Sequence, residues 1–180
     1  MLNKRSAVFL GCGIGAAVLI ALDQLVKIWA TANLQGQPGR PLIQGILHLT
    51  YLENTGAAFG LLAGFGGAQL LLTAVKLIIM VLVIVYFAKL PLKTRFMFLR
   101  VPLVLIFTGG VGNLIDRVRL GFVVDMLEFG FIQFPVFNLA DIYVTVGTFF
   151  FAIAVLFLVK DAPLFGATKA DDASVDMMQK

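Results

Sequence analysis

The stretch FPVFNLADIYVTVGTFFFAIAVLFLVK, residues 134–160, is the clearest indication of the fold. It holds eighteen consecutive uncharged residues, 142–159, and a helix needs roughly 20 mostly apolar residues to cross a membrane. Asp141 stands directly before this run, three residues after Asn138. A charge beside hydrocarbon is costly, and ionisable residues placed there are usually functional. The stretch therefore predicts a spanning helix with a functional carboxylate at its start.

The composition extends this interpretation to the whole chain. Of its 180 residues, 60% are hydrophobic, whereas soluble domains contain about 45–50% apolar residues. Charged residues make up only 13%, and the mean hydropathy is +0.98. We expect an all-α integral membrane domain over residues 1–160 and a disordered polar tail over residues 161–180. Its four transmembrane helices are expected at 7–29, 68–88, 96–115 and 139–159.

Basic residues predict the orientation, because Lys and Arg accumulate on the cytoplasmic side of membrane proteins. With the N-terminus inside, nine of the 14 Lys and Arg residues fall at cytoplasmic ends or loops. Both termini are therefore expected in the cytoplasm, with segments 30–67 and 116–138 outside. The alternating run GILHLTYLE in the first segment predicts a small β-like cradle resting on the membrane. The second segment is expected to form another outer loop.

Polar residues gather at one depth, the outer membrane–water boundary. Asp23 and Lys27 are four residues apart on the first predicted helix and are expected to pair on one face. The others lie in the outer segments or at the outer ends of the third and fourth helices: Asn54, Asn113, Asp116, Arg117, Asp125, Asn138 and Asp141. This convergence predicts a site at the outer face.

Several of these residues also have purely structural interpretations. The Asp23–Lys27 pair would ease insertion into the membrane, and the adjacent Asp116 and Arg117 would neutralise each other. Asn138 is well placed to cap the fourth helix.

Three other residues need separate interpretations. Lys76, inside the second span, is expected to extend outward along its aliphatic stem. Asp125 and Asp141 are harder to explain in this way, because each is a carboxylate among apolar residues with no obvious cation reserved for it.

The residues available at the predicted site exclude several kinds of catalysis. The two serines, Ser6 and Ser174, lie at predicted cytoplasmic ends, and Cys12 lies too deep in the first span. With His48 as the one histidine, an ordinary His/Cys metal site cannot be assembled, so no metal or cofactor is expected. The basic residues are scattered, so no nucleic-acid partner is expected. The remaining candidates are two carboxyl groups that share one desolvated site. Because both cannot ionise there, one acts as an acid and the other as a base, and together they can promote the attack of water on an amide carbon.

Five motifs with this topology resemble the family of bacterial lipoprotein signal peptidases, also called signal peptidase II. They are DQLVK (23–27), NTGAAFG (54–60), GGVGNLIDR (109–117), VVDM (123–126) and FNLAD (137–141). The resemblance implies a bacterial inner-membrane aspartic endopeptidase that cleaves prolipoproteins just before a diacylglyceryl-modified cysteine. It implies Asp125 and Asp141 as the catalytic pair. It also implies supporting roles for Asp23, Lys27, Asn54, Asn113, Asp116, Arg117 and Asn138. The implied partners are the lipidated substrate and membrane lipids, and the protein is expected to be monomeric.

Two other classes of function compete with this one. A small proton-coupled transporter or channel would also use intramembrane carboxylates, but a conduction path needs polar groups through the full depth of the membrane. A scaffold subunit with structural ion pairs would leave Asp125 unexplained. The sequence leaves open which aspartate holds the proton at rest, because a pair sharing one proton titrates as a unit.

Overall fold

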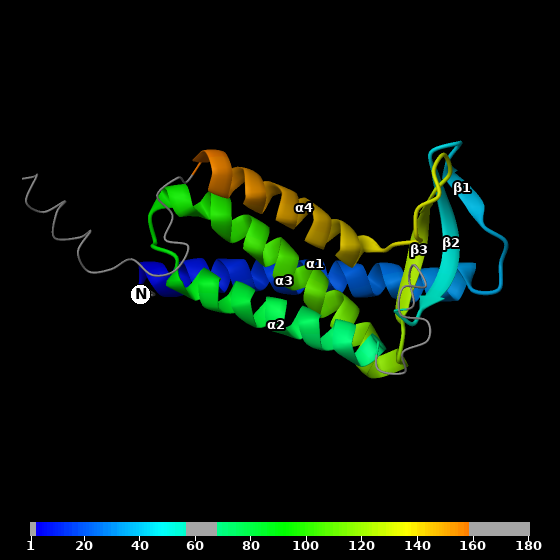
Figure 1. Cartoon of the computed structure of the whole chain (residues 1–180), viewed down its shortest axis with the longest axis horizontal. Helices are drawn as coiled ribbons and strands as arrows, with labels where there is room; N and C mark the ends of the chain where they lie inside the picture. The colour runs from blue at the N-terminus through cyan, green and yellow to red at the C-terminus, as the bar shows by residue number, and fades with distance from the viewer. Residues whose placement is uncertain (1–2, 57–67, 159–180) are drawn as a thin grey trace, which may run out of the picture.

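The computed structural model describes residues 3–56 and 68–158, which form a helical bundle with a small sheet at one end (Figure 1). The helices are α1 (Lys4–Leu34), α2 (Ala68–Lys89), α3 (Met97–Leu120) and α4 (Leu139–Ile153). A 3₁₀ turn, Thr94–Phe96, leads into α3, and a π-helical turn, Ala154–Leu158, continues α4. The strands are β1 (Arg40–Ile43), β2 (Leu47–Asn54) and β3 (Val123–Phe129).

The bundle has the polarity of a membrane protein. Three helical segments of the described residues are long and apolar enough to cross a bilayer: Lys4–Leu34, Thr94–Leu120 and Leu139–Phe157. Along α1, large apolar side chains such as Leu10 and Leu22 are exposed, while Asp23 is buried. Exposed leucines around a buried charge suit a lipid surrounding rather than water. The prediction of an integral membrane protein is confirmed, and α2 as a fourth span stays a prediction.

Two helices extend beyond the predicted transmembrane spans, whose bounds stay predictions. α1 continues to Leu34, past residue 29, and α3 continues to Leu120, past residue 115. α3 ends at Gly121, whose φ of 83° is the left-handed conformation that glycine adopts readily at a helix C-terminus. Nothing interrupts the last turns of α3 before Gly121, so Asn113, Asp116 and Arg117 stand on a continuous helix. The predicted tail, 161–180, lies outside the described residues.

The sheet has the order β1-β2-β3, with both pairs antiparallel. Strands β1 and β2 come from the segment whose alternating pattern predicted a sheet. β3 lies in the segment expected to be a loop, and that expectation is wrong. Its first four residues, Val123–Met126, are all buried, so the strand lacks the alternating pattern that marks a half-exposed strand. The fold is therefore a helical bundle with a three-stranded sheet rather than an all-α structure.

Packing fixes this sheet and α4 against the bundle. Leu49, Val124 and Met126 of the sheet pack on Ala30 and Leu34 near the end of α1. The α3–α4 contact is close enough to require glycine.

Two glycines show how closely α3 and α4 approach each other. A β-carbon added to Gly109 of α3 would collide with the carbonyl oxygen of Ala140, and one added to Gly147 of α4 would lie 2.8 Å from the carbonyl oxygen of Pro102. The first turn of α4 is thereby pressed against α3 beside the sheet.

Candidate active site

Asp125 on β3 and Asp141 in the first turn of α4 meet at Asn138. The Asn138 side-chain amide donates to Oδ1 of Asp125 at 2.6 Å, and its backbone N–H donates to Oδ2 of Asp141 at 3.1 Å. The Asn138 oxygen in turn accepts from the backbone N–H of Asp141 at 3.0 Å, which completes a capping box. The predicted cap by Asn138 is confirmed. The geometry that starts α4 therefore also orients Asp141.

Amide groups also hold the second oxygen of each carboxylate. Asn54 donates to Oδ2 of Asp125 at 2.8 Å, and Asn113 donates to Oδ1 of Asp141 at 2.8 Å. The Asn54 oxygen accepts from the backbone N–H of Gly56, so its side chain is held at both ends. Three asparagines from β2, α3 and the start of α4 thus hold the two carboxyl groups with neutral donors.

The two carboxyl groups are not equivalent in environment. Asp125 is only 1% exposed. Its burial raises its pKa from 3.8 to about 6; the hydrogen bond from Asn54 opposes this rise, and the charge of Asp141 adds to it. Asp141 lies at a helix N-terminus, where backbone N–H groups favour a negative charge. The environment of Asp125 therefore favours its protonated form.

A buried ion cluster lies beside this pair. The ammonium of Lys27 is 3.1 Å from Oδ2 of Asp23 and 2.9 Å from Oδ2 of Asp116, and it donates to Oδ1 of Asn113 at 2.9 Å. The predicted Asp23–Lys27 pair is confirmed. The predicted pairing of Asp116 with Arg117 is wrong: consecutive residues point in different directions on a helix, and Asp116 faces α1.

The ion cluster also holds the elements that carry the two aspartates. Asp23 accepts from the backbone N–H of Ala140 at 3.0 Å, immediately before Asp141. Asp116 accepts from the backbone N–H of Val124 at 3.2 Å, immediately before Asp125. Removing one member of a buried ion pair typically costs about 3–5 kcal/mol, because it leaves an uncompensated charge. The cluster thus fixes both aspartates through their neighbours in the chain.

Gln24 belongs to this cluster, and our sequence analysis missed it. Its amide nitrogen lies 3.0 Å from Oδ1 of Asp116, 3.2 Å from Oδ2 of Asp23 and 3.2 Å from the carbonyl oxygen of Gly112. The signal was present in DQLVK, where Gln24 stands between the paired charges, but only the charges were considered. A β-carbon on Gly112 would come within 2.6 Å of Asp23, so a glycine is needed there.

Arg117 differs from the other predicted site residues. It is half-buried, and its Nε is buried without a hydrogen-bond partner among the described residues. The other predicted site residues make hydrogen bonds or ion pairs within the two groups described above. Arg117 therefore has a side-chain donor without a partner among the described residues.

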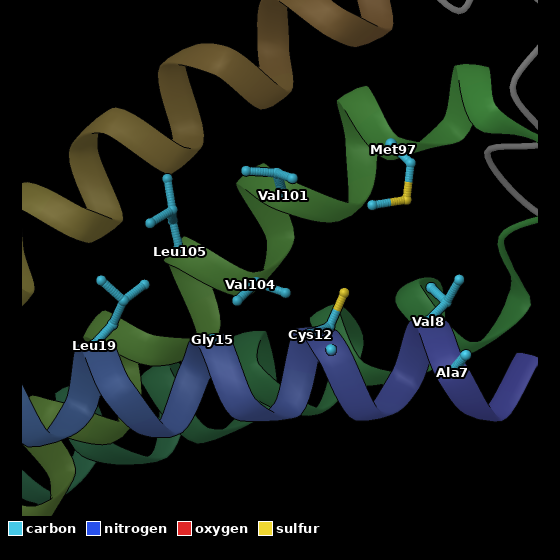
Figure 2. A pocket seen from close by; sticks show the side chains of 10 residues that line it. Ala7, Val8, Cys12, Gly15, Leu19, Met97, Val101, Val104 and Leu105 are labelled. Atoms are coloured by element: carbon cyan, nitrogen blue, oxygen red, sulfur yellow. The ribbon is translucent and has the colours of Figure 1, made fainter. Parts of the chain in front are cut away.

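A groove between α1 and α3 lies away from the carboxylates, towards the start of α1. It has a volume of about 400 Å³, and Figure 2 shows Cys12 and Leu19 of α1 and Val101 and Leu105 of α3 lining it. Its lining is apolar apart from the Cys12 thiol, so it lacks an acid and a base. No group of three or more His, Cys, Asp or Glu side chains in the described residues could hold a metal ion. The carboxyl pair is therefore the candidate active site.

Sequence comparisons connect this arrangement to a known family. The family model described as "Signal peptidase (SPase) II" matches residues 15–157. The lipoprotein signal peptidase of Clostridioides difficile (strain 630) is 49% identical over 142 residues, covering 78% of this chain and 90% of that protein. That of Streptococcus agalactiae serotype III (strain NEM316) is 42% identical over 137 residues, covering 76% and 86%.

Solved structures agree with these relatives. A bacterial membrane enzyme determined by the in meso method at 1.9 Å resolution superposes with a TM-score of 0.69 and 29% identity, covering 82% of this chain and 93% of its own. A second, at 2.3 Å resolution, gives a TM-score of 0.67 and 27% identity, covering 88% and 94%. The similarity therefore extends over most of each protein.

Proposed function

Because the chain belongs to the signal peptidase II family, we propose that it is an aspartic endopeptidase that uses Asp125 and Asp141 to cleave lipid-modified prolipoproteins. The cleaved bond is the one just before the diacylglyceryl-modified cysteine. The observation that carries the proposal is the meeting of a buried carboxyl group, Asp125, and a half-buried one, Asp141, at one end of a membrane bundle.

The proposed reaction follows from the unequal environments of Asp125 and Asp141. Asp141, ionised, removes a proton from water, and the water oxygen attacks the carbonyl carbon of the scissile amide. Asp125 gives its proton to the carbonyl oxygen, which forms a neutral tetrahedral diol. On collapse the C–N bond breaks, the proton on Asp141 passes to the leaving nitrogen, and a diol proton returns to Asp125. The pair ends in its starting state, having consumed one water molecule.

The location of the pair suits such a substrate. A signal helix lies in the bilayer and the lipidated cysteine is held at its surface, so the bond to be cut falls near the interface. The carboxylates of the described residues gather around the sheet and the start of α4, an arrangement that does not favour a transporter: Asp23 and Asp116 contact the residues before Asp141 and Asp125, and Glu53 and Glu128 lie on the sheet. We place this end at the outer face of the bacterial inner membrane, with both chain termini in the cytoplasm, in a monomeric enzyme. The sheet would cradle the substrate.

The surrounding residues take supporting roles in this proposal. Asn54, Asn113 and Asn138 orient the carboxyl groups. Asp23, Lys27 and Asp116 hold the elements that carry them. Arg117, whose Nε has no partner among residues 3–56 and 68–158, is assigned to the substrate backbone, since a hydrogen bond to a charged group contributes about 1.5–3 kcal/mol.

Substitution of the aspartates tests the proposal. Purified Asp125→Asn and Asp141→Asn proteins in lipid should fail to shorten a diacylglyceryl precursor peptide, while the wild-type protein cleaves it. Glu53→Gln is a matched control, because it also neutralises a carboxylate at the sheet end, on an exposed residue. It should retain activity. Substantial turnover by either folded aspartate variant would refute the assignment.

A further inference from the structure

The end of the bundle opposite the sheet carries positive charge that no acidic side chain of the described residues balances. It is formed by the start of α1, the end of α2 and the start of α3 (Figure 1). The described ranges 3–22, 79–107 and 147–158 contain no Asp or Glu, whereas they contain several basic residues: Lys4, Arg5, Lys89, Lys93, Arg95 and Arg100. The first acidic residue along α1 is Asp23, about 27 Å from Arg5 along the helix axis.

An apolar groove lies between α1, α2 and α3 at this end. It has a volume of about 220 Å³ and is apolar apart from the Cys12 thiol, which also lines the groove of Figure 2. Phe9, Gly13 and Ala16 contribute one face of α1 to its lining, and Phe87 lines it from α2. A β-carbon added to Gly13 would meet nothing within 4 Å, so the groove is open there. Its lining suits a hydrocarbon chain.

Two arginines flank the aromatic part of this groove. The rings of Phe9 and Phe87, whose centroids are 5.2 Å apart, line it together. The guanidinium carbon of Arg5 lies 5.6 Å from the Phe9 centroid, and Arg5 donates to the carbonyl oxygen of Ala88 at 3.3 Å. The guanidinium carbon of Arg100 lies 5.7 Å from the Phe87 centroid. Both cations are therefore in contact with residues that line the groove.

Neither arginine is neutralised within the described part of the chain. Arg100 is 1% exposed and donates to the carbonyl oxygens of Leu90 and Pro91, at 2.7 and 2.8 Å, while its Nε has no partner among the described residues. These acceptors are neutral, so the buried charge of Arg100 still favours a nearby anion. Arg5 is exposed, and in the described part of the chain its guanidinium makes one hydrogen bond although it carries five donors. Arg5 can therefore bind an anion directly, with the charge of Arg100 behind it.

We infer that this groove binds an anionic phospholipid, with the phosphate on Arg5 and one acyl chain between α1 and α2. A phosphate diester supplies the negative charge that this end lacks, and guanidinium groups bind phosphate oxygens strongly, often through two parallel N–H donors. A zwitterionic lipid would bring a further cation close to Arg5 and Arg100, so the charges select against it. The site is separate from the carboxyl pair, and the inference does not depend on the peptidase reaction.

Native mass spectrometry of the purified protein in detergent tests the inference by counting bound lipid molecules. Phosphatidylglycerol is the anionic probe, and phosphatidylcholine with the same acyl chains is the zwitterionic one. The wild-type protein should bind one phosphatidylglycerol about tenfold more tightly than phosphatidylcholine. Arg5→Gln should weaken phosphatidylglycerol binding about tenfold, because it removes the charged donors.

Two further variants separate the effect of charge from that of shape. Arg95→Gln is the matched control, because it removes an arginine of the same end whose guanidinium lies over Phe96, a residue that does not line the groove. It should bind phosphatidylglycerol as the wild-type protein does. Gly13→Leu keeps every charge and places a side chain in the open part of the groove, so it should also weaken binding.

Several results would overturn the inference. Equal affinity for the two lipids would show that charge does not select the ligand. Equal weakening by Arg5→Gln and Arg95→Gln would show that the basic residues act only as a diffuse surface charge. Unchanged binding in Gly13→Leu would place the lipid outside the groove. A protein dimer in place of the lipid adduct would make the groove a contact between two copies of the chain.

Discussion

At the scale of single residues, Asp125 and Asp141 receive hydrogen bonds from neutral donors, and the buried cation beside them is paired with other carboxylates. The carboxyl groups of Asp125 and Asp141 are held by asparagine amides and a backbone N–H, and the nearest buried cation, Lys27, is bound to two other carboxylates. A direct ion pair would hold both aspartates ionised, which would remove the acid that the reaction needs. Neutral donors orient the pair and leave one proton on it.

This arrangement predicts how activity depends on pH. Asp125 has a pKa of about 6, so as pH rises through about 6 the free enzyme loses its acid and kcat/KM should fall. A pH series with a lipidated precursor peptide measures it, and a constant kcat/KM from about pH 5 to 8 would contradict it. Because the folded-state pKa lies above the ordinary 3.8, Asp125 also contributes stability at low pH that is lost as pH rises from about 4 to about 6.

At the scale of elements, the start of α4 combines a cap with a catalytic support. The Asn138 oxygen caps the helix, while its amide nitrogen reaches Asp125 and, at 3.0 Å, Oδ1 of Asn113. One side chain thus links the beginning of a helix to a strand and a neighbouring helix. The two roles are separable by substitution.

Asn138→Ser should keep the cap and lose the contacts of the amide. Serine is a good N-cap residue, so the unfolding midpoint should stay close to that of the wild-type protein. Cleavage should fall roughly tenfold, since the amide loses two hydrogen bonds, to Asp125 and Asn113, and a hydrogen bond between neutral groups contributes about 0.5–1.5 kcal/mol. Asn138→Ala should lose about 1 kcal/mol of stability in addition. Thermal unfolding in detergent and turnover per folded enzyme measure the two effects, and full activity of Asn138→Ser would contradict this role.

The α3–α4 contact gives a second prediction at this scale. Gly109→Ala places a methyl group against the Ala140 carbonyl, and overpacking of this kind typically costs about 1–3 kcal/mol. It should lower the unfolding midpoint and also reduce cleavage, because Ala140 adjoins Asp141. Gly13→Ala is the control, since a β-carbon there meets nothing within 4 Å. Equal stability of the two variants would show that the close contact is unimportant.

At the scale of the whole molecule, a cluster of charged side chains is buried between helices that expose many large apolar side chains. The buried charges of Asp23, Lys27 and Asp116 join α1 to α3 and reach α4 and β3 through backbone N–H groups. In a bilayer, helices gain little from burying apolar surface against each other, so polar contacts and close packing hold them together. The ion cluster therefore contributes to assembly of the bundle as well as to the site.

The distribution of Lys and Arg predicts how this molecule sits in the membrane. In a Cys12→Ala background, a cysteine at Gln37 should react with a membrane-impermeant thiol reagent in intact cells, and one at Lys93 should react only after lysis. The physical reason is the cytoplasmic preference of basic residues, which cluster near Lys93. The reverse labelling pattern would invert the orientation and place the carboxyl pair at the inner face.

The sequence by itself determined the membrane class, the gathering of polar residues at one end of the helices and the cap at Asn138, because hydropathy, helix periodicity and capping are properties of contiguous residues. Only the tertiary structure decided that β3 is a strand, because its pairing with β2 is distant in the chain and its buried residues do not alternate. It alone paired Asp116 with Lys27, since charges on separate helices meet according to packing. Local patterns specify which residues are polar and at what depth, whereas helix rotation and close glycine contacts decide which of them touch.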